Sequence, residues 1–349
     1  MREYKSNFFL KRDEKKSITA FKTNNVDFPG NAIVELSNAC NHFCVFCNNP
    51  RMKRKINTLD KETFIRFMSE GFKMGMKEVG LYATGEPFLT KNINWYIKKS
   101  KEIGIDRIYV TSNGSLASLD KVKEAYDNGL SSIKYSINAG TKENYKIIHG
   151  VDDFMKVKKN IEDVFNWKNK NNVKLQLLGS FTYTKLTKNE IPVYKKTFGK
   201  FFEDVMFFPA SSQGGRINGI IEQISDHNLL KTKDEIGPCD MLWNRVHLTC
   251  EGYLTACCID YELDLVYADF KNSNEKLNDI WNNKIIKKLR KKHIEKKLDN
   301  TVCKNCLMGT KESYEKLTNI PMKENAILKT TDVIKRTEIV SKSMKEQKL

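Results

Sequence analysis

Three cysteines in one short loop constrain this 349-residue chain more than any other feature. Cys40, Cys44 and Cys47 lie at a C-x3-C-x2-C spacing, directly after the apolar run 32–36. Thiolates packed this closely can hold one cubane iron–sulfur cluster. With three cysteines and no fourth nearby, one iron would stay open to an exchangeable ligand. A zinc loop is the alternative, because His42 can supply the fourth ligand that zinc needs.

The chain from 31 to 210 alternates short β-branched runs with helical patterns, which predicts parallel βα units. The expected strands are 33–36, 78–82, 107–111, 132–137, 174–181 and 204–208. The expected helices are 92–103, 119–128, 153–170 and 189–201, with a further one through Phe64, Phe67, Met68 and Phe72. Six βα units are too few for an eight-stranded barrel, and their chemistry belongs at the C-terminal strand ends.

Polar residues and a glycine follow the second, third and fourth of these strands. The second ends in Thr84-Gly85-Glu86-Pro87, where the glycine lets backbone approach a ligand and the carboxylate can accept hydrogen bonds from an ammonium group. The residues that close the next two strands are Ser112, Asn113, Ser136 and Asn138. Hydroxyl and amide groups there can bind a ribose or a carboxylate, although they also simply make turns.

The cysteine loop, with aromatic Phe46 before its last cysteine, and the Gly-Glu-Pro turn about forty residues later resemble the radical S-adenosylmethionine (SAM) superfamily. The resemblance implies an α/β fold with an open (βα)6 partial TIM barrel. It also implies a [4Fe–4S] cluster on the three cysteines whose open iron binds SAM. The SAM-binding residues that it implies are Phe46, Thr84, Gly85, Glu86, Ser112, Asn113, Ser136 and Asn138. Thr84 stands where the family has a glycine, which is a mild departure.

A second group of cysteines begins at residue 239, in the order C…G-x4-C…C-x2-C. This order resembles the SPASM/twitch extension of radical SAM enzymes. Since the seven cysteines of a full SPASM domain are not present, the resemblance implies one auxiliary [4Fe–4S] cluster held by Cys239, Cys257, Cys303 and Cys306. Cys258 is an alternative to Cys257, and Cys250 is predicted to be a spare buried thiol. A zinc ribbon with four cysteine ligands is the competing interpretation.

These patterns predict five segments: an N-terminal extension (1–30), the radical SAM partial barrel (31–210), a bridge (211–236), a small cysteine-rich auxiliary-cluster domain (237–310) and a charged tail (311–349). Within the auxiliary domain, apolar residues at 277, 281, 285 and 289 predict one helix face. Basic residues such as Arg290 are expected to be more exposed.

The net charge of +17 is spread along a chain rich in lysine and asparagine, so we interpret it as solvated surface and do not expect nucleic acid as a partner. The short spacings within each cysteine group indicate metal binding and not disulfides. The first 13 residues lack an apolar signal core, and no apolar run reaches 18 residues. We therefore expect a cytoplasmic protein without membrane association.

The resemblance implies reductive cleavage of SAM to methionine and a 5′-deoxyadenosyl radical, which abstracts hydrogen from a substrate. We expect a dehydrogenase-type oxidoreductase that acts on a small hydroxylated metabolite of the sugar or aminocyclitol type. Its expected partner is a low-potential electron donor such as flavodoxin or ferredoxin. The alternatives are modification of a peptide or protein, and a non-enzymatic basic metal-binding protein that contacts RNA. Arg216, Asp240 and Asp260 are candidate proton acceptors, among which the sequence does not choose.

Overall fold

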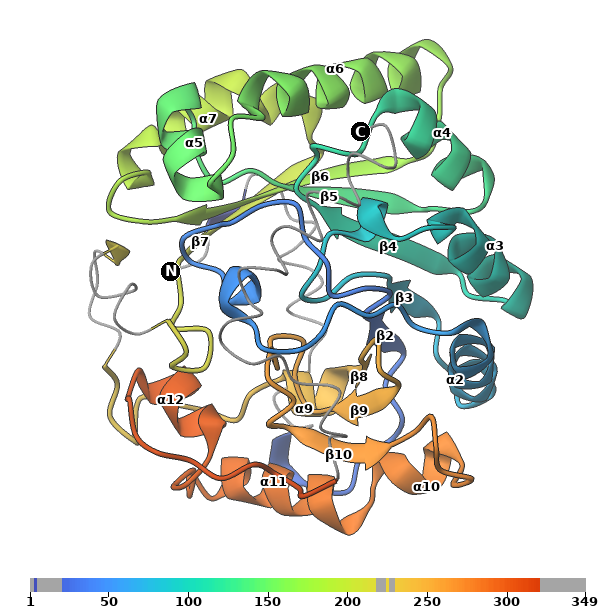
Figure 1. Cartoon of the computed structure of the whole chain (residues 1–349), viewed down its shortest axis with the longest axis vertical. Coiled ribbons are helices and arrows are strands. Elements are labelled where there is room, and N and C mark those ends of the chain that lie inside the picture. Colours follow the sequence, from blue (N-terminus) through green and yellow to red (C-terminus); the bar gives the residue numbers. More distant parts are fainter. Residues whose placement is uncertain (1–2, 5–20, 218–223, 226–229, 321–349) are drawn as a thin grey trace.

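In the computed structural model, residues 3–4, 21–217, 224–225 and 230–320 are described, and they form one ten-stranded sheet. Six neighbouring strands pair in parallel, which confirms the six predicted strands, and the sheet does not close (Figure 1). In sheet order they are β7 (Asp204–Pro209), β6 (Gln176–Tyr183), β5 (Ser132–Ser136), β4 (Arg107–Ser112), β3 (Glu78–Gly80) and β2 (Asn31–Val34).

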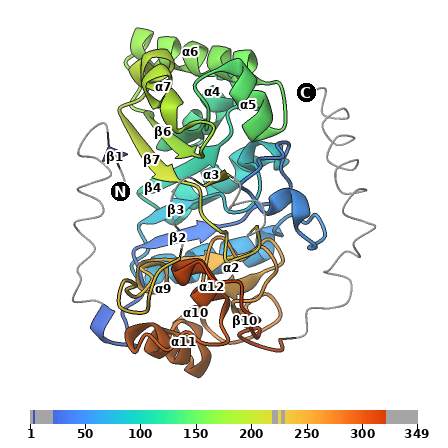
Figure 2. The same cartoon turned by 90° about the vertical axis from the view of Figure 1, so that its left-hand side faces the viewer.

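Helices connect these strands and cover the outer face of the sheet (Figure 2). They are α2 (Lys61–Lys73), α3 (Ile93–Ile103), α4 (Leu119–Asp127), α5 (Lys142–His149), α6 (Phe154–Lys170) and α7 (Ile191–Thr197). Short 3-10 turns are η2 (Asn49–Arg51), η3 (Pro87–Leu89), η4 (Lys188–Glu190) and η5 (Gly199–Phe201). Helix α5 was not predicted, because eight residues are too few for a clear apolar period. Its ends nevertheless have clear signals. The Thr141 side chain caps the helix by accepting a hydrogen bond from Asn144 N, and Gly150 ends it in the left-handed backbone region.

Alternation along the strands gives the sheet two different faces. On β5, Ile133 and Tyr135 are buried in the main core with the helices. Lys134 and Ser136, which alternate with them, are only partly buried and face the concave side. Thr111 repeats this pattern on β4. The concave face of the barrel therefore carries polar side chains beside apolar ones such as Leu178, which pairs with Lys134.

The auxiliary segment continues the same sheet beyond β2. Strand β8 (Val246–Leu248) pairs in parallel with β2, and β9 (Tyr253–Thr255) and β10 (Val266–Asp269) follow in antiparallel order. Gly252, in the turn between β8 and β9, has a φ of 90°, which favours glycine. The helices here are α9 (Met241–Asn244), α10 (Leu277–Trp281), α11 (Lys284–Ile294) and α12 (Val302–Met308).

The single helix predicted through residues 277–289 is two helices. Asn283 interrupts it and caps α11 by accepting hydrogen bonds from Ile285 N and Ile286 N. The expected exposure of Arg290 is wrong, since its side chain is fully buried. Its Nε donates to Leu242 O at 2.9 Å and its guanidinium lies 4.3 Å from the ring centroid of Trp281. Burial lowers the pKa of Arg290 to about 10.

The N-terminal extension contacts both ends of the sheet. Strand β1 (Glu3–Tyr4) pairs with β7, and residues 21–28 pack on the auxiliary helices. There, Trp243 Nε1 donates to Thr23 O at 2.8 Å. The part of the predicted tail from 321 onward lies outside the described residues. None of the helices in the described part of the chain has the length and apolar sequence needed to cross a membrane.

Candidate active site and cluster-binding cysteines

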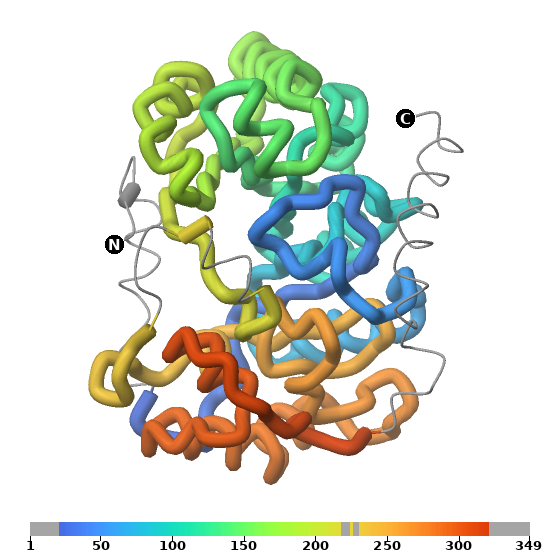
Figure 3. The backbone as a smooth tube through the Cα atoms, turned by 60° about the vertical axis from the view of Figure 1, so that its left-hand side comes forward, coloured from blue at the N-terminus to red at the C-terminus, as the bar shows by residue number. Residues whose placement is uncertain are grey.

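The cysteine loop lies at the C-terminal end of β2 and is fixed by backbone hydrogen bonds to the end of α5. Phe43 N donates to His149 O at 2.9 Å, and Val45 N donates to Ile148 O at 3.0 Å. Figure 3 shows this blue loop beside the orange auxiliary segment. The three predicted ligands, Cys40, Cys44 and Cys47, are all partly buried. The structure thus places them at the strand end where the barrel rule expects chemistry.

The predicted Gly-Glu turn packs directly on this loop. A Cβ atom at Gly85 would lie 2.4 Å from Ser37 O and 2.5 Å from Ala39 O, so only glycine fits. The next residue, Glu86, donates its N–H to Ala39 O at 2.7 Å. The sequence therefore needs glycine here because two backbones meet.

The Glu86 carboxylate is buried and held by three donors. It accepts hydrogen bonds from Ser112 Oγ at 2.8 Å, Asn113 N at 2.8 Å and Phe88 N at 3.1 Å. Burial raises the pKa of Glu86 to about 7, against the lowering effect of these donors. Lys121 is the one cation among the causes that act on this pKa, and its effect is smaller than that of the three donors. A cationic ligand group at this place would offset the cost of burying the charge.

The other predicted SAM residues are placed in different ways. Asn138 is buried, and its Oδ1 accepts from Thr182 N at 2.7 Å. Ser136 is partly buried on the concave face, and Phe46 packs on Ala210 and Ile217. Thr84 donates its hydroxyl to Glu35. Of these four residues, Ser136 is the one that carries a hydroxyl group, lies on the concave face and is partly exposed.

Two buried histidines, which the sequence did not single out as a pair, lie beside the cysteine loop. His149 Nε2 accepts the N–H of Asn138 at 3.1 Å, so the neutral ring carries its proton on Nδ1. That Nδ1 lies 3.2 Å from His42 Nδ1 and 3.6 Å from Cys44 Sγ. Burial, together with His42, holds the pKa of His149 well below its usual value. A neutral His149 can therefore donate toward the cysteine sulfur.

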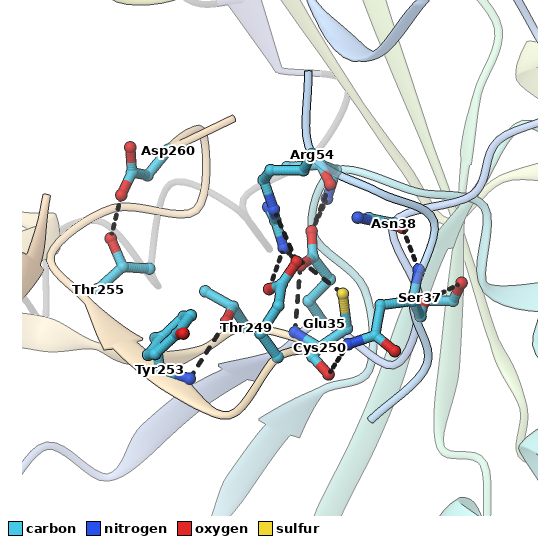
Figure 4. Close-up of polar contacts among 12 residues, drawn as sticks. Glu35, Ser37, Asn38, Arg54, Thr249, Cys250, Tyr253, Thr255 and Asp260 are labelled. Carbon is cyan, nitrogen blue, oxygen red and sulfur yellow. Dashed lines mark hydrogen bonds and ion pairs between the residues drawn. The ribbon is translucent and has the colours of Figure 1, made fainter. Parts of the chain in front are cut away.

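A buried ion network joins the barrel to the auxiliary segment (Figure 4). The guanidinium of Arg54 lies 2.5 Å from Glu35 on one side and 2.5 Å from Glu251 on the other. Burial opposes ionisation of Glu35, but Arg54 holds the pKa of this carboxyl below its usual value. Arg54 also donates to Cys250 Sγ at 3.4 Å, so the thiol predicted to be spare is buried but not idle.

The second predicted cysteine set converges on one cavity. Its lining includes Cys239, Cys257, Cys303 and Cys306. The aliphatic part of the wall is Leu242, Ala256, Ile259, Leu265, Val302 and Leu307. Cys258, the alternative ligand, is not among the lining residues. Burial, with the charges of Asp240 and Cys306, raises the pKa of Cys239 to about 12, so a thiolate there needs a positive group such as a metal cluster.

The donor sets fit clusters better than single ions. A tetrahedral zinc ion with bonds of about 2.3 Å brings its sulfur ligands to within about 4 Å of one another. In the described part of the chain, two groups of three donor atoms lie within 4.8 Å, and neither consists of the predicted cluster cysteines. They are His42, Cys44 and His149, and Glu35, Cys250 and Glu251. Among the described residues, neither predicted cysteine set therefore has three sulfurs as close together as a single zinc ion needs.

Two of the candidate proton acceptors are engaged elsewhere. Arg216 lies 2.5 Å from Asp264 and 3.6 Å from Asp260, and these carboxylates raise its pKa against the effect of burial. Asp260 accepts from Thr255 Oγ1 at 2.7 Å and from Leu265 N at 2.9 Å. Both residues therefore brace the auxiliary loop, and Arg216 also lines the cavity shared by the auxiliary cysteines.

A family model for the radical SAM superfamily matches residues 34–184, and a model for the SPASM iron–sulfur cluster-binding domain matches residues 239–307. The chain belongs to the radical SAM superfamily and carries a SPASM domain after its barrel. Its cofactors are accordingly a SAM-binding [4Fe–4S] cluster, an auxiliary cluster and SAM. This assignment speaks against a non-enzymatic RNA-binding protein.

Curated relatives match part of the chain. A probable GTP 3′,8-cyclase of Sulfurisphaera tokodaii is 31% identical over 132 residues, which are 37% of this chain and 41% of the relative. A GTP 3′,8-cyclase of Clostridium perfringens is 32% identical over 150 residues, which are 41% of this chain and 44% of the relative. The chain thus spans less than half the length of these relatives.

Solved structures share the fold over most of the chain. BtrN in complex with AdoMet and 2-DOIA has a TM-score of 0.54 at 18% identity, covering 83% of this chain and 98% of BtrN. Streptococcus suis SuiB bound to precursor peptide SuiA has a TM-score of 0.57 at 16% identity, covering 91% of this chain and 79% of SuiB. At these identities the likeness shows the fold alone.

Proposed function

We propose that this radical SAM enzyme oxidises a small hydroxylated metabolite of the sugar or aminocyclitol type, with help from its auxiliary cluster. The observation that carries the proposal is the convergence of Cys239, Cys257, Cys303 and Cys306 on one cavity. Four thiolates satisfy every iron of a cubane, which leaves no iron open to the substrate. Such a cluster is suited to accept an electron.

When bound, the cofactors supply the redox chemistry. The first cluster and SAM would supply the abstraction of a hydrogen atom from a substrate carbon, with an electron from a donor such as flavodoxin or ferredoxin, and the auxiliary cluster would supply an acceptor for the second electron. The chain itself holds the parts in place. Cys40, Cys44 and Cys47 would ligate the first cluster, and the buried Glu86 carboxylate would hold the ammonium group of SAM. The hydroxyl proton must leave to a base that is yet to be identified.

Polar side chains on the concave face support a hydroxylated substrate. Thr111, Lys134 and Ser136 are partly buried on this face, where they can exchange hydrogen bonds with hydroxyl groups. The rings of Tyr82 and Tyr109 lie on the same face, 5.9 Å apart. The fold shared with BtrN, whose structure holds AdoMet and 2-DOIA, adds support for SAM and a small polar molecule in one barrel.

A metabolite screen tests the proposal. Reconstituted protein is mixed with SAM, a reductant and a panel of sugars, aminocyclitols and other polyols, and substrate-dependent 5′-deoxyadenosine is measured. We expect a product two mass units lighter than the substrate. In the Cys239→Ala/Cys303→Ala variant, 5′-deoxyadenosine should still form while the oxidised product disappears. Oxidation at the wild-type rate by that well-folded variant would show that the auxiliary cluster is structural.

Modification of a peptide is the second candidate, and the fold likeness to SuiB bound to a precursor peptide favours it. The same assay separates the two candidates. Peptides that stimulate 5′-deoxyadenosine formation and change in mass, with no response to polyols, would replace the proposal with this alternative.

A further inference from the structure

Tyr261 occupies a rigid turn of the auxiliary segment, directly after Cys257 and Cys258. The turn is fixed by Asp260, whose carboxylate accepts from Asp264 N at 2.8 Å and from Leu265 N at 2.9 Å. The Tyr261 side chain is buried, with 5% of its surface exposed. Its ring direction is therefore set by the fold of the auxiliary segment.

This side chain reaches across to the cysteine loop of the barrel. Tyr261 Oη lies 3.4 Å from Cys47 Sγ, although 214 residues of sequence separate them. The adjacent residue makes a second contact with the same loop, because the Glu262 carboxylate accepts from Lys53 N at 3.2 and 3.3 Å. Two successive residues of the auxiliary turn thus contact the last predicted cluster ligand and the segment that follows it.

The direction of the Tyr261 hydrogen bond follows from the chemistry of the sulfur. A cysteine that ligates iron is a thiolate and has no proton to give, so the phenol must donate. Asn49 N donates to the same sulfur at 3.4 Å. Hydrogen bonds to cluster sulfurs stabilise the more negative, reduced cluster and are one of the factors that set its potential.

We propose that Tyr261 is a positioning residue through which the auxiliary domain tunes the SAM-binding cluster. Its O–H group donates to Cys47 and raises the reduction potential of the cluster held by the barrel. Electron entry into the first site then depends on correct folding of the second. This inference rests on Cys47 being a cluster ligand, and it holds whatever substrate the enzyme uses.

The test is Tyr261→Phe, with Tyr267→Phe as the matched control. Tyr267 is a buried tyrosine of the same segment whose hydroxyl has no hydrogen-bond partner among the described residues. Both variants are reconstituted, iron and sulfide are counted, and reductive titrations are followed by EPR. The signal that changes on adding SAM belongs to the first cluster. We expect Tyr261→Phe to keep its iron and to need a more negative potential, while Tyr267→Phe titrates like the wild type.

A wild-type potential in an iron-replete Tyr261→Phe protein would overturn the proposal. If Tyr261→Phe loses iron, 3-fluorotyrosine at position 261 decides, because its phenol is a stronger donor of almost the same size. The proposal then requires a shift to a less negative potential, and an unchanged potential refutes it. The substrate assay plays no part in these outcomes, so they are independent of the proposed oxidation.

Discussion

The two cysteine sites of this protein are built on opposite plans. The barrel site takes Cys40, Cys44 and Cys47 from a single loop, with polar groups such as Tyr261 Oη and His149 Nδ1 near the sulfurs. The auxiliary site gathers four cysteines from positions 239 to 306 around one cavity, which is lined mostly by aliphatic side chains and also by Arg216 and His293. The cysteines of the first site are neighbours in sequence, whereas those of the second site are brought together by the tertiary fold.

The difference in surroundings matches a difference in expected use. A site with three thiolates and polar neighbours leaves room for a charged ligand such as SAM. A site with four thiolates leaves no iron of a cubane open to a ligand, which suits electron storage or structural support. Substitutions at each site should affect the two clusters differently, and substitutions between the sites test the contacts that join them.

Removing the three cysteines of the barrel site should have the largest effect. Wild-type protein reconstituted without oxygen should hold about eight irons and eight sulfides, as two [4Fe–4S] clusters require. The Cys40→Ala/Cys44→Ala/Cys47→Ala variant should keep about half of this iron and lose all SAM cleavage. Cys250→Ala, which removes a buried cysteine outside both ligand sets, should keep all its iron. Stoichiometric zinc without an iron chromophore would contradict both sites.

The auxiliary site can be sharpened by comparing two adjacent cysteines. Cys257 lines the cavity and Cys258 is not among its lining residues. We therefore expect Cys257→Ser to lose the auxiliary cluster and about half of the iron, while Cys258→Ser keeps both clusters. Iron counts and EPR of the reduced proteins measure this difference. The reverse pattern would exchange the ligand assignment of the two residues.

The link between the sites is tested by Arg54→Met. This change leaves the carboxylates of Glu35 and Glu251 buried without their partner, which typically costs about 3–5 kcal/mol. Lys159→Met removes an exposed pair with Asp163 and should change the free energy of unfolding by less than about 0.5 kcal/mol. Urea unfolding of cluster-free protein compares them. Equal stability of the two variants would show that the buried network does not hold the barrel and auxiliary segment together.

Much of the barrel was predictable, because its signals are local. All six parallel strands were predicted, since each is a short β-branched run bounded by turn residues. Helix α5 was not predicted because it is short. The break at Asn283 was not predicted because the apolar spacing continues across it. The predicted exposure of Arg290 was wrong. The helical pattern does not show that the Arg290 guanidinium packs on the Trp281 ring and that its Nε donates to Leu242 O.

The cysteine sets and the Gly-Glu turn were visible in sequence because their spacing is itself the signal. The contacts that connect the sites were not, since Tyr261 and Cys47 meet only through the tertiary fold. The same is true of Arg54 and Glu251, which are 197 residues apart. Of these residues, Glu35 is the one with a sequence signal for burial, because its carboxylate lies within the apolar run 32–36.

The smallest expected effect concerns Glu86, the buried carboxylate that we propose holds the ammonium group of SAM at the barrel site. Its pKa is raised by burial to about 7, above the ordinary value of 4.5. A group with a raised pKa favours the folded state fully below the unfolded value, and this contribution is lost as pH rises through 7. Without SAM, the wild type should therefore lose stability between about pH 4.5 and 7, by at most about 3.4 kcal/mol at about 1.36 kcal/mol for each pKa unit.

Glu86→Gln should weaken this pH dependence and leave the iron content unchanged. SAM affinity should fall, because the variant cannot make a charge-assisted hydrogen bond to the ammonium group, which is worth roughly 1.5–3 kcal/mol. Wild-type affinity should also decline below pH 7, where the ligand must first displace a proton, whereas the affinity of the variant should not. Glu190→Gln is the control, since its buried carboxylate accepts from Gly140 N at 2.8 Å and Asn144 Nδ2 at 2.8 Å and from none of the three donors that hold Glu86. Isothermal titration with SAM from pH 5.5 to 8.5 measures all three proteins. An unaltered affinity in Glu86→Gln would mean that the buried carboxylate serves only Ser112, Asn113 and Phe88, and that the SAM ammonium is held elsewhere.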